Sequence, residues 1–287
     1  MYYLQQNPAA FVLAAFLLSL LVGSFLNVVI LRLPKMLERE WKGQCEALFG
    51  ETETDKAAAP FNLVAPASHC PGCGHRIRPW ENIPLISYLF LRGRCSACKR
   101  RIPVRYPAVE LATGLLSALV AWRFGFGWET AFALVLTWSL VALSVIDFDE
   151  QLLPDNITLP LLWLGLLVNV GGVFTSLPDA VIGAAAGYLA LWLIFHLFRL
   201  LTGKEGMGYG DFKLLAVFGA WLGWQSLPLI VLLSSLVGAV VGIALIILRG
   251  RDRNIPIPFG PYLAAAGWLA LLWREEFTAL YFRWAGL

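Results

Sequence analysis

Two acidic segments lie far apart in this chain, and each borders an apolar run. The first, SVIDFDEQLLPDNIT, places Asp147 directly after an apolar stretch and continues with Asp149, Glu150 and Asp155. The second, GMGYGDFKLL, places Asp211 at the start of another apolar stretch. Ionisable groups beside membrane spans are costly, so each of these acids is a candidate functional residue. Two carboxyl groups held close together share a proton and can activate water, which is the chemistry of an aspartic peptidase.

Asp147 is the preferred partner of Asp211, because it adjoins the apolar run more closely than the other three acids do. Asp149 and Glu150 belong to the exposed turn that follows. Asp155 comes after a proline, and the N-cap of the next span is an equally good interpretation of it. A solvated acidic loop is the alternative interpretation of the cluster as a whole.

The segment around Asp211 carries three glycines at alternate positions, Gly206, Gly208 and Gly210. They predict backbone conformations that other residues avoid and a close approach of a substrate strand. A phosphate-binding turn is disfavoured, since no strand precedes the glycines and an aspartate would repel phosphate. Lys213 is expected either to lower the total charge of the acid pair or to extend towards lipid headgroups.

Four cysteines form two C-x-x-C pairs with 21 residues between them: Cys70, Cys73, Cys95 and Cys98. Each pair places two thiolates on one side of a tight turn, so the four can close a tetrahedral zinc site. Two disulfides are the alternative, but cytoplasmic thiols are kept reduced. A site with four thiolates has no open coordination position, so its expected role is to stabilise a small domain.

The two cysteine turns, or knuckles, differ in sequence. The first is CPGCG, in which Gly74 is expected to adopt a positive φ and let peptide N–H groups point at the thiolates. The second is CSACK, which lacks that glycine, and the cationic Lys99, Arg100 and Arg101 are expected to offset the thiolate charge. The remaining residues of this kind are interpreted as surface histidines and a spare thiol: His69, His75 and Cys45.

The composition shows what kind of fold must position these groups. Of 287 residues, 59% are hydrophobic and 14% charged, and the mean hydropathy is +0.69. Soluble domains carry about 25% charged residues, so a water-soluble globule is excluded. Only helices or closed barrels satisfy the backbone in lipid, and these apolar runs are too long for barrel strands. The predicted fold is all-α, a polytopic helical membrane protein of about eight transmembrane helices, near residues 9–31, 107–124, 128–147, 157–174, 180–201, 212–224, 226–248 and 260–282.

Basic residues orient these predicted spans. Nineteen of the 22 lysines and arginines map to one face, thirteen of them between Arg32 and Arg105. The positive-inside rule makes that face cytoplasmic, with the N-terminus outside, and both acidic segments map to it. Because the basic residues flank spans in this way, the net charge of +3 indicates no nucleic-acid partner.

The expected domain organisation follows from the same pattern. It comprises a transmembrane anchor at 1–33, a cytoplasmic zinc-binding insertion at 34–106 and a membrane-embedded peptidase domain at 107–287. Within the insertion, the polar stretch from Glu38 to Asn62 is expected to form a loop or a loosely ordered helix.

Five motifs occur in an order that resembles one family. They are the paired C-x-x-C motifs, PWENIPLISY, IDFDEQLLPD, GMGYGDFK and PIPFGPYLA. Together they resemble the type IV prepilin peptidases, which are bacterial inner-membrane aspartic peptidases of the GxGD type that also N-methylate their product. The resemblance covers essentially the whole chain. It implies that Asp147 and Asp211 are catalytic, that the four cysteines bind metal, and that Gly93 is associated with methyl transfer.

The resemblance also implies substrates and a cofactor. The chain would cut the basic leader of a type IV prepilin or pseudopilin on the cytoplasmic side, and Asp149, Glu150 and Asp155 could attract that leader. It would then methylate the new N-terminus with S-adenosylmethionine. Because the sequence contains no glycine-rich nucleotide-binding turn, the expected donor contacts lie in the insertion. They are Glu81, Asn82 and Gly93, although the aromatic residues nearby could simply pack this loop onto the bilayer surface.

Two other classes of protein compete with this interpretation. A proton- or cation-coupled transporter with a regulatory zinc loop would carry its acids near the middle of spans, whereas Asp147 and Asp211 are predicted at span ends. Glu110 lies close enough to Arg105 along a helix to pair with it or to extend towards the interface. A non-catalytic assembly scaffold would make both aspartates dispensable.

Overall fold

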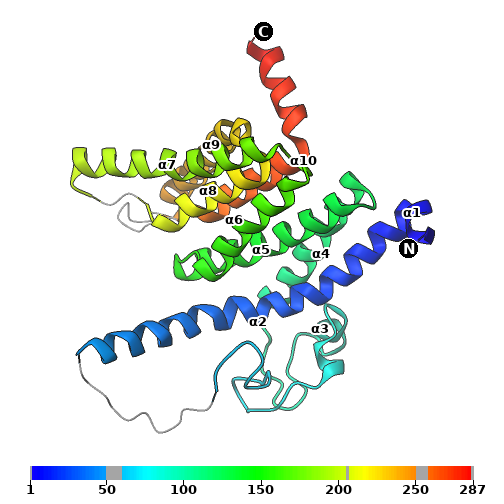
Figure 1. The fold of residues 1–287 in the computed structure, drawn as a ribbon. Coiled ribbons are helices and arrows are strands. Elements are labelled where there is room, and N and C mark those ends of the chain that lie inside the picture. The colour runs from blue at the N-terminus through cyan, green and yellow to red at the C-terminus, as the bar shows by residue number, and fades with distance from the viewer. Residues whose placement is uncertain (1, 50–59, 205–206, 250–257, 286–287) are drawn as a thin grey trace. The chain divides into compact units, whose positions relative to one another are not determined.

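The computed structural model describes residues 2–49, 60–204, 207–249 and 258–285. Within these ranges all elements of regular secondary structure are helices, as Figure 1 shows, and the all-α prediction is confirmed. The elements are α1 (Tyr2–Gln6), α2 (Pro8–Phe49), η1 (Pro79–Asn82), α3 (Ile86–Phe90), α4 (Arg105–Phe124), α5 (Trp128–Glu150), α6 (Asp155–Val170), α7 (Leu177–Thr202), α8 (Tyr209–Leu222), η2 (Trp224–Ser226), α9 (Leu227–Arg249) and α10 (Gly260–Ala285). Of the sequence features named above, Gly206 and residues 50–59 of the stretch from Glu38 to Asn62 lie outside the described ranges.

Each of the eight predicted spans corresponds to a helix, but the helices differ in length. In the described part of the chain, four helical stretches are long and apolar enough to cross a membrane, which identifies a membrane protein: Pro8–Phe49, Trp128–Glu150, Leu177–Thr202 and Trp224–Ala244. Helices α6 and α8 have 16 and 14 residues. At 1.5 Å per residue these cover about 24 and 21 Å, short of the roughly 30 Å of a hydrocarbon core. Length and composition therefore support four spans, and the total of about eight stays a prediction.

The chain divides into two compact units, Met1–Phe126 and Gly127–Leu287. In the N-terminal unit, α2 and α4 cross at close range because both carry glycine at the contact. A Cβ on Gly23 would lie 2.8 Å from the Cα of Glu110, and one on Gly114 would lie 2.9 Å from the Phe16 ring. Small residues permit such close helix packing.

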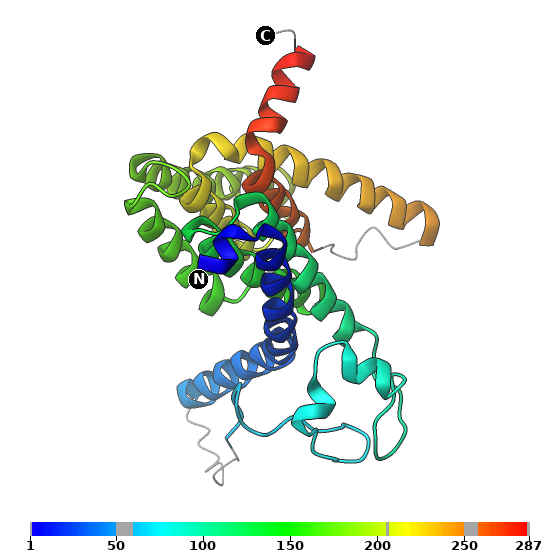
Figure 2. The ribbon, with the colours of Figure 1, turned by 90° about the vertical axis from the view of Figure 1, so that its right-hand side faces the viewer.

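Helix α2 continues well past its apolar part, so the predicted loosely ordered stretch is helical as far as Phe49. The cysteine-bearing loop, residues 60–104, lies beside α2 and the start of α4, as Figure 2 shows in cyan. Arg32 of α2 ties the beginning of this loop to the helix. Its guanidinium donates hydrogen bonds to the carbonyl oxygens of Asn62 at 2.9 Å and Pro66 at 2.7 Å.

In the C-terminal unit, α8 lies among α6, α7, α9 and α10, as Figure 1 shows. All of its residues are buried except Tyr209, Gly210 and Lys213. A helix that is apolar on all sides can be enclosed by protein, and apolar runs of 10 to 14 residues are commonly buried core helices. The predicted sixth span, at 212–224, corresponds to this short, enclosed helix, and its assignment as a span stays a prediction.

Candidate functional site

Asp211 lies in the first turn of α8 and is only 7% exposed. Its N–H donates to the carbonyl oxygen of Gly208 at 3.3 Å. Gly208, the N-cap of α8, has φ −85°, and Gly210 is helical, so the predicted glycine-only conformations are wrong for these two. Gly210 is required for packing instead, because a Cβ there would lie 2.8 Å from the Cβ of Leu153.

Asp147 lies in the last turn of α5 and is 6% exposed. The N–H of Gly260 donates to its Oδ2 at 3.0 Å. Gly260 is the first residue of α10, so this N–H is one of the groups that a helix leaves without an internal partner. The positive end of the helix dipole favours a carboxylate at that place. A Cβ on Gly260 would lie 2.6 Å from Oδ2, which explains why a glycine stands there.

Leu153 links the segments that carry the two acids. Its side chain lies 2.8 Å from the Cβ position of Gly210 and 3.3 Å from that of Gly260. The carboxyl groups of Asp147 and Asp211 are close enough to repel one another electrostatically. The site therefore combines two buried carboxyl groups. Asp211 belongs to the first turn of α8, and the Asp147 carboxyl group, from the end of α5, lies against the N-terminus of α10.

Gly260 and Leu153 have positions in this site that the sequence analysis did not assign. Gly260 belongs to the PIPFGPYLA motif, which was noted without a role. Its signal was therefore present, but a contact between positions 113 residues apart cannot be read from a motif.

The other acids of the first segment have different surroundings. Asp149 and Glu150 are exposed. Asp155 is the first residue of α6, whose N-cap is Pro154, so the N-cap interpretation is wrong by one residue. Both carboxylate oxygens of Asp155 accept hydrogen bonds from the Lys213 ammonium at 2.7 Å. Lys213 thus forms an ion pair with Asp155, an arrangement that neither sequence-based interpretation of Lys213 included.

The four cysteines of the two C-x-x-C pairs meet at one point in the N-terminal unit, where all four Sγ atoms lie within 4.8 Å of one another. The Sγ distance is 3.8 Å between Cys70 and Cys98 and 4.0 Å between Cys73 and Cys95. A disulfide would require about 2.05 Å, and all four cysteines are free. Four sulfurs around a zinc ion at about 2.3 Å would lie about 3.8 Å apart. The cluster could therefore hold one metal ion, and the disulfide alternative is wrong.

The two knuckles have the same backbone geometry despite their different sequences. In the first, the Cys70 N–H donates to the His75 carbonyl oxygen and the Gly74 N–H donates to that of Cys70, both at 2.9 Å. The second repeats both bonds, with Lys99 in the place of Gly74. Gly74 has φ +71° as predicted, and Lys99 has φ +60°, a conformation that costs a side-chain-bearing residue about 1–2 kcal/mol. The Gly72 N–H lowers the pKa of Cys70 to about 7.

His75 is not an ordinary surface residue, because it takes part in a polar network between the knuckles. Its Nε2 lies 3.1 Å from Glu81 Oε2 and 3.2 Å from the Ser96 hydroxyl. The Arg78 N–H donates to the same Glu81 oxygen at 2.9 Å. Ser96, then Arg78 and His75, lower the pKa of Glu81 to about 2. The stabilisation that Glu81 supplies is therefore present above its ordinary pKa and is lost only as the pH falls towards 2.

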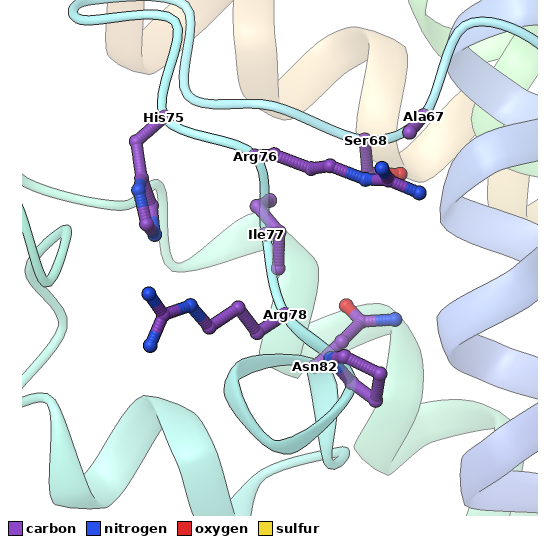
Figure 3. A pocket seen from close by; sticks show the side chains of 8 residues that line it. Ala67, Ser68, His75, Arg76, Ile77, Arg78 and Asn82 are labelled. Carbon is purple, nitrogen blue, oxygen red and sulfur yellow. The ribbon is translucent and has the colours of Figure 1, made fainter.

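Two cavities lie beside this network. One, of about 510 Å³, is drawn in Figure 3 and is lined by residues including Ser68, His75, Arg76, Arg78 and Asn82. The other, of about 440 Å³, is lined by residues that include Glu81, Asn82, Tyr88 and Glu110.

Three residues were expected to contact the methyl donor, and two of them, Glu81 and Asn82, line the 440 Å³ cavity. Gly93 has φ +66°, and a Cβ there would lie 2.9 Å from the Tyr88 hydroxyl, so its place in the loop depends on having no side chain. Trp80 is 62% exposed, with the Arg78 guanidinium 5.5 Å from its ring centre. The contact roles of Glu81, Asn82 and Gly93 stay predictions.

Comparisons with known proteins match both halves of the chain. Residues 17–124 match the bacterial peptidase A24 N-terminal domain, and residues 134–243 match the type IV leader peptidase family. A relative named prepilin leader peptidase/N-methyltransferase from Pseudomonas aeruginosa is 61% identical over 284 residues, covering 99% of this chain and 98% of the relative. A relative with the same name from Xanthomonas campestris is 48% identical, covering 100% of both chains. One from Legionella pneumophila is 49% identical, covering 92% of both chains. No solved structure matches the chain.

The fold and site thus define a helical membrane protein with a pair of buried acids and a four-cysteine cluster. The chain belongs to the type IV leader peptidase family. The resemblance identified from the five motifs is confirmed, and the transporter alternative receives no support from these comparisons.

Proposed function

We propose that this chain cleaves the leader peptide of type IV prepilins or pseudopilins with Asp147 and Asp211, and then N-methylates the new N-terminal residue. The observation that carries the proposal is the burial of two interacting carboxyl groups, each at a helix N-terminus. Relatives that match nearly the whole chain bear the corresponding name.

In the peptidase reaction, one aspartate accepts a proton from water while the other donates a proton to the carbonyl oxygen or the leaving amine. The Gly260 N–H occupies Oδ2 of Asp147, which orients this carboxyl group and leaves its other oxygen for water or the second acid. Because two neighbouring carboxyl groups do not both ionise readily, they hold one proton between them, and the pair titrates as a unit.

The cysteine cluster is proposed to hold a structural zinc ion through Cys70, Cys73, Cys95 and Cys98. Four thiolates fill a tetrahedral coordination sphere and leave no open position for substrate. The ion would stabilise the loop that carries Glu81 and Asn82, since binding a structural metal contributes directly to folding. This proposal assigns the cluster no part in peptide cleavage.

The second activity is proposed for the N-terminal unit. S-adenosylmethionine supplies the methyl group, and Glu81, Asn82 and Gly93 are the proposed contacts. The residues fit such a ligand in that two of them line a cavity of about 440 Å³ beside the cysteine cluster. We propose three functional parts: a membrane anchor at 1–33, a methyltransferase part at 34–106 and a peptidase domain at 107–287.

The protein is proposed to reside in the bacterial inner membrane with both activities facing the cytoplasm. The basic residues concentrate on that predicted face. Asp149 and Glu150 are exposed and are proposed to attract a basic leader, and Asp155 forms an ion pair with Lys213. Cys45 offers a test, because it is an exposed cysteine outside the cluster. A membrane-impermeant maleimide should label it in inverted vesicles but not in intact spheroplasts, and the reverse pattern would reject the orientation.

The peptidase proposal is tested by incubating purified protein with a prepilin in detergent. Wild type is compared with Asp147→Ala, Asp211→Ala and the control Glu46→Gln, whose side chain is exposed on α2. Both aspartate variants should lose cleavage while the control keeps it. Retained cleavage by either aspartate variant would reject the pair.

A further inference from the structure

The cavity of about 440 Å³ opens between α2, the start of α4 and the cysteine-bearing loop, within the N-terminal unit. Pockets for small organic ligands occupy about 300–1,000 Å³, so its size suits a metabolite. Its lining combines charged, amide and aromatic groups, among them Asn27, Glu81, Asn82, Tyr88 and Glu110. This mixture resembles a ligand site more than a packing defect, which would be lined by apolar groups.

Glu110 is the group in this cavity for which the peptidase mechanism has no use. It lies in the second turn of α4 and is 8% exposed. Its Oε2 accepts the N–H of Leu85 at 2.9 Å, and the Ser24 hydroxyl donates to the same carboxyl group. Both donors are neutral. A buried carboxylate is costly unless a positive charge compensates it, and its two oxygens can accept more than two hydrogen bonds.

The two cavities of this unit differ in charge. The eight residues that line the cavity in Figure 3 include Arg76 and Arg78 and no acid. The lining of the 440 Å³ cavity carries both signs of charge, with Glu81 and Glu110 beside Arg32, Arg100 and Arg101. Because Glu81 is already engaged with Ser96 and His75, Glu110 is the acid that remains for a cationic ligand. A ligand that carries both a positive and a negative group is therefore favoured in the 440 Å³ cavity, with its positive group facing Glu110.

We propose that this cavity binds S-adenosylmethionine, with the Glu110 carboxylate facing the sulfonium of the donor. The inference rests on the proposed methyltransferase function and identifies where that function binds its donor. Arg100 and Arg101 line the same cavity and would face the donor's carboxylate. Tyr88 and Tyr106 add aromatic surface for the adenine ring. The methyl donor is the preferred occupant because its positive sulfur complements an acid whose present partners are neutral.

The test compares two ligands that differ in charge at sulfur. Binding of labelled S-adenosylmethionine and of S-adenosylhomocysteine, in which the sulfur is neutral, is measured by equilibrium dialysis on the purified full chain without peptide. Glu110→Gln keeps an oxygen that can accept the Leu85 N–H, so the local fold is retained. Since a hydrogen bond to a charged group contributes about 1.5–3 kcal/mol, this variant should bind S-adenosylmethionine about 10- to 100-fold more weakly. Binding of S-adenosylhomocysteine should change by less than about threefold.

Glu46→Gln serves as the matched control, because this exposed acid of α2 lies outside the cavity lining and should leave both affinities unchanged. Equal weakening of both ligands by Glu110→Gln would assign the acid a purely structural role and overturn the proposal. Unchanged donor binding, or weakened binding of a cleaved pilin peptide alone, would also overturn it. A wild-type protein that binds no donor would instead reject the methyltransferase function, and this site with it.

Discussion

The cysteine-bearing loop and helix α8 hold functional groups in place by opposite means. In residues 60–104 the buried residues are few, namely Cys70, Pro84, Gly93 and Cys95. In α8, by contrast, nearly every side chain is buried among four neighbouring helices. The loop therefore depends on backbone hydrogen bonds and on whatever the four thiolates bind. Helix α8 depends on close packing, and its only exposed or half-exposed positions surround Asp211.

The difference shows how each region tolerates polar groups. The loop keeps its polar groups near water and connects them through short hydrogen bonds, such as those of Glu81 with His75 and Arg78. The C-terminal unit buries two acids and compensates them with helix N-termini. We therefore expect the loop to be sensitive to loss of metal and to a change in pH. The acid site should instead be sensitive to small changes in side-chain packing.

The largest expected effect is the loss of cleavage on neutralising either acid. Asp147→Asn and Asp211→Asn preserve side-chain size, so the α8 packing should persist while water can no longer be activated. We expect prepilin cleavage to fall by more than about a thousandfold, in line with the combined loss of acid and base catalysis.

Methylation of a synthetic, already cleaved pilin N-terminus should be retained by both aspartate variants. Cleavage is followed by gel shift and methylation by transfer of labelled methyl groups. A parallel loss of both activities would contradict the independence of the two units.

Removal of the metal should have the second largest effect, and it should be confined to the loop. Structural zinc sites contribute about 10–16 kcal/mol of apparent binding energy to folding. Cys95→Ser, or treatment with a chelator, should therefore expose residues 60–104 to trypsin and abolish methylation, while cleavage of a prepilin persists. Because protons compete with the metal for thiolates, lowering the pH towards 5 should have the same effect.

Cys45→Ser is the matched control for the metal experiment, since Cys45 is an exposed thiol outside the cluster. Zinc content, measured by mass spectrometry, should fall in Cys95→Ser and stay constant in Cys45→Ser. A loop that resists trypsin equally with and without metal would show that hydrogen bonds alone stabilise it.

Gly260→Ala should reduce cleavage by an intermediate amount. The new methyl group would approach Asp147 Oδ2 to 2.6 Å, so the carboxyl group must move away from the N-terminus of α10. Because displacing a catalytic group by about 1 Å can cost about a hundredfold, we expect kcat to fall about 10- to 100-fold with little change in KM.

Gly238→Ala provides the comparison for Gly260→Ala. Its new Cβ would lie 3.4 Å from the nearest atom, in the Tyr262 ring, which is an ordinary van der Waals distance. This variant should cleave like wild type. If the two alanine variants behaved alike, the contact between Gly260 and Asp147 would have no part in catalysis.

Breaking the ion pair between Lys213 and Asp155 should have the smallest effect. The pair is partly exposed, and exposed pairs contribute about 0–1 kcal/mol. Lys213→Gln and Asp155→Asn should each reduce cleavage by less than about threefold, and the double variant should resemble the single ones. A large loss with Lys213→Gln but not with Asp155→Asn would show that the lysine acts on the aspartate pair directly.

Much of this site was accessible from the sequence because its strongest signals are local. The spacing of the cysteines predicted that they meet, and the position of Asp147 after an apolar run distinguished it from the exposed acids nearby. Gly74 was expected to adopt a positive φ, and it does. These predictions succeeded because they depend on a turn or on a single helix end.

The failures involve contacts between distant segments. Lys213 pairs with Asp155 across 58 positions, and His75 reaches Ser96 in the other knuckle. Lys99 adopts a left-handed conformation that its side chain disfavours, because the second knuckle must match the first. The enclosure of α8 by other helices was not predicted for 212–224, since hydropathy cannot distinguish a helix exposed to lipid from one surrounded by protein.

The sequence by itself determined that the protein is a helical membrane protein of this family, because composition, apolar run length and motif order are properties of the linear chain. The tertiary structure decided which groups meet. It placed the first N–H of α10 against Asp147, turned Gly210 and Gly260 into packing requirements around Leu153, and buried Glu110 at a cavity. These relations depend on distances between helices, and such distances arise only when side chains pack.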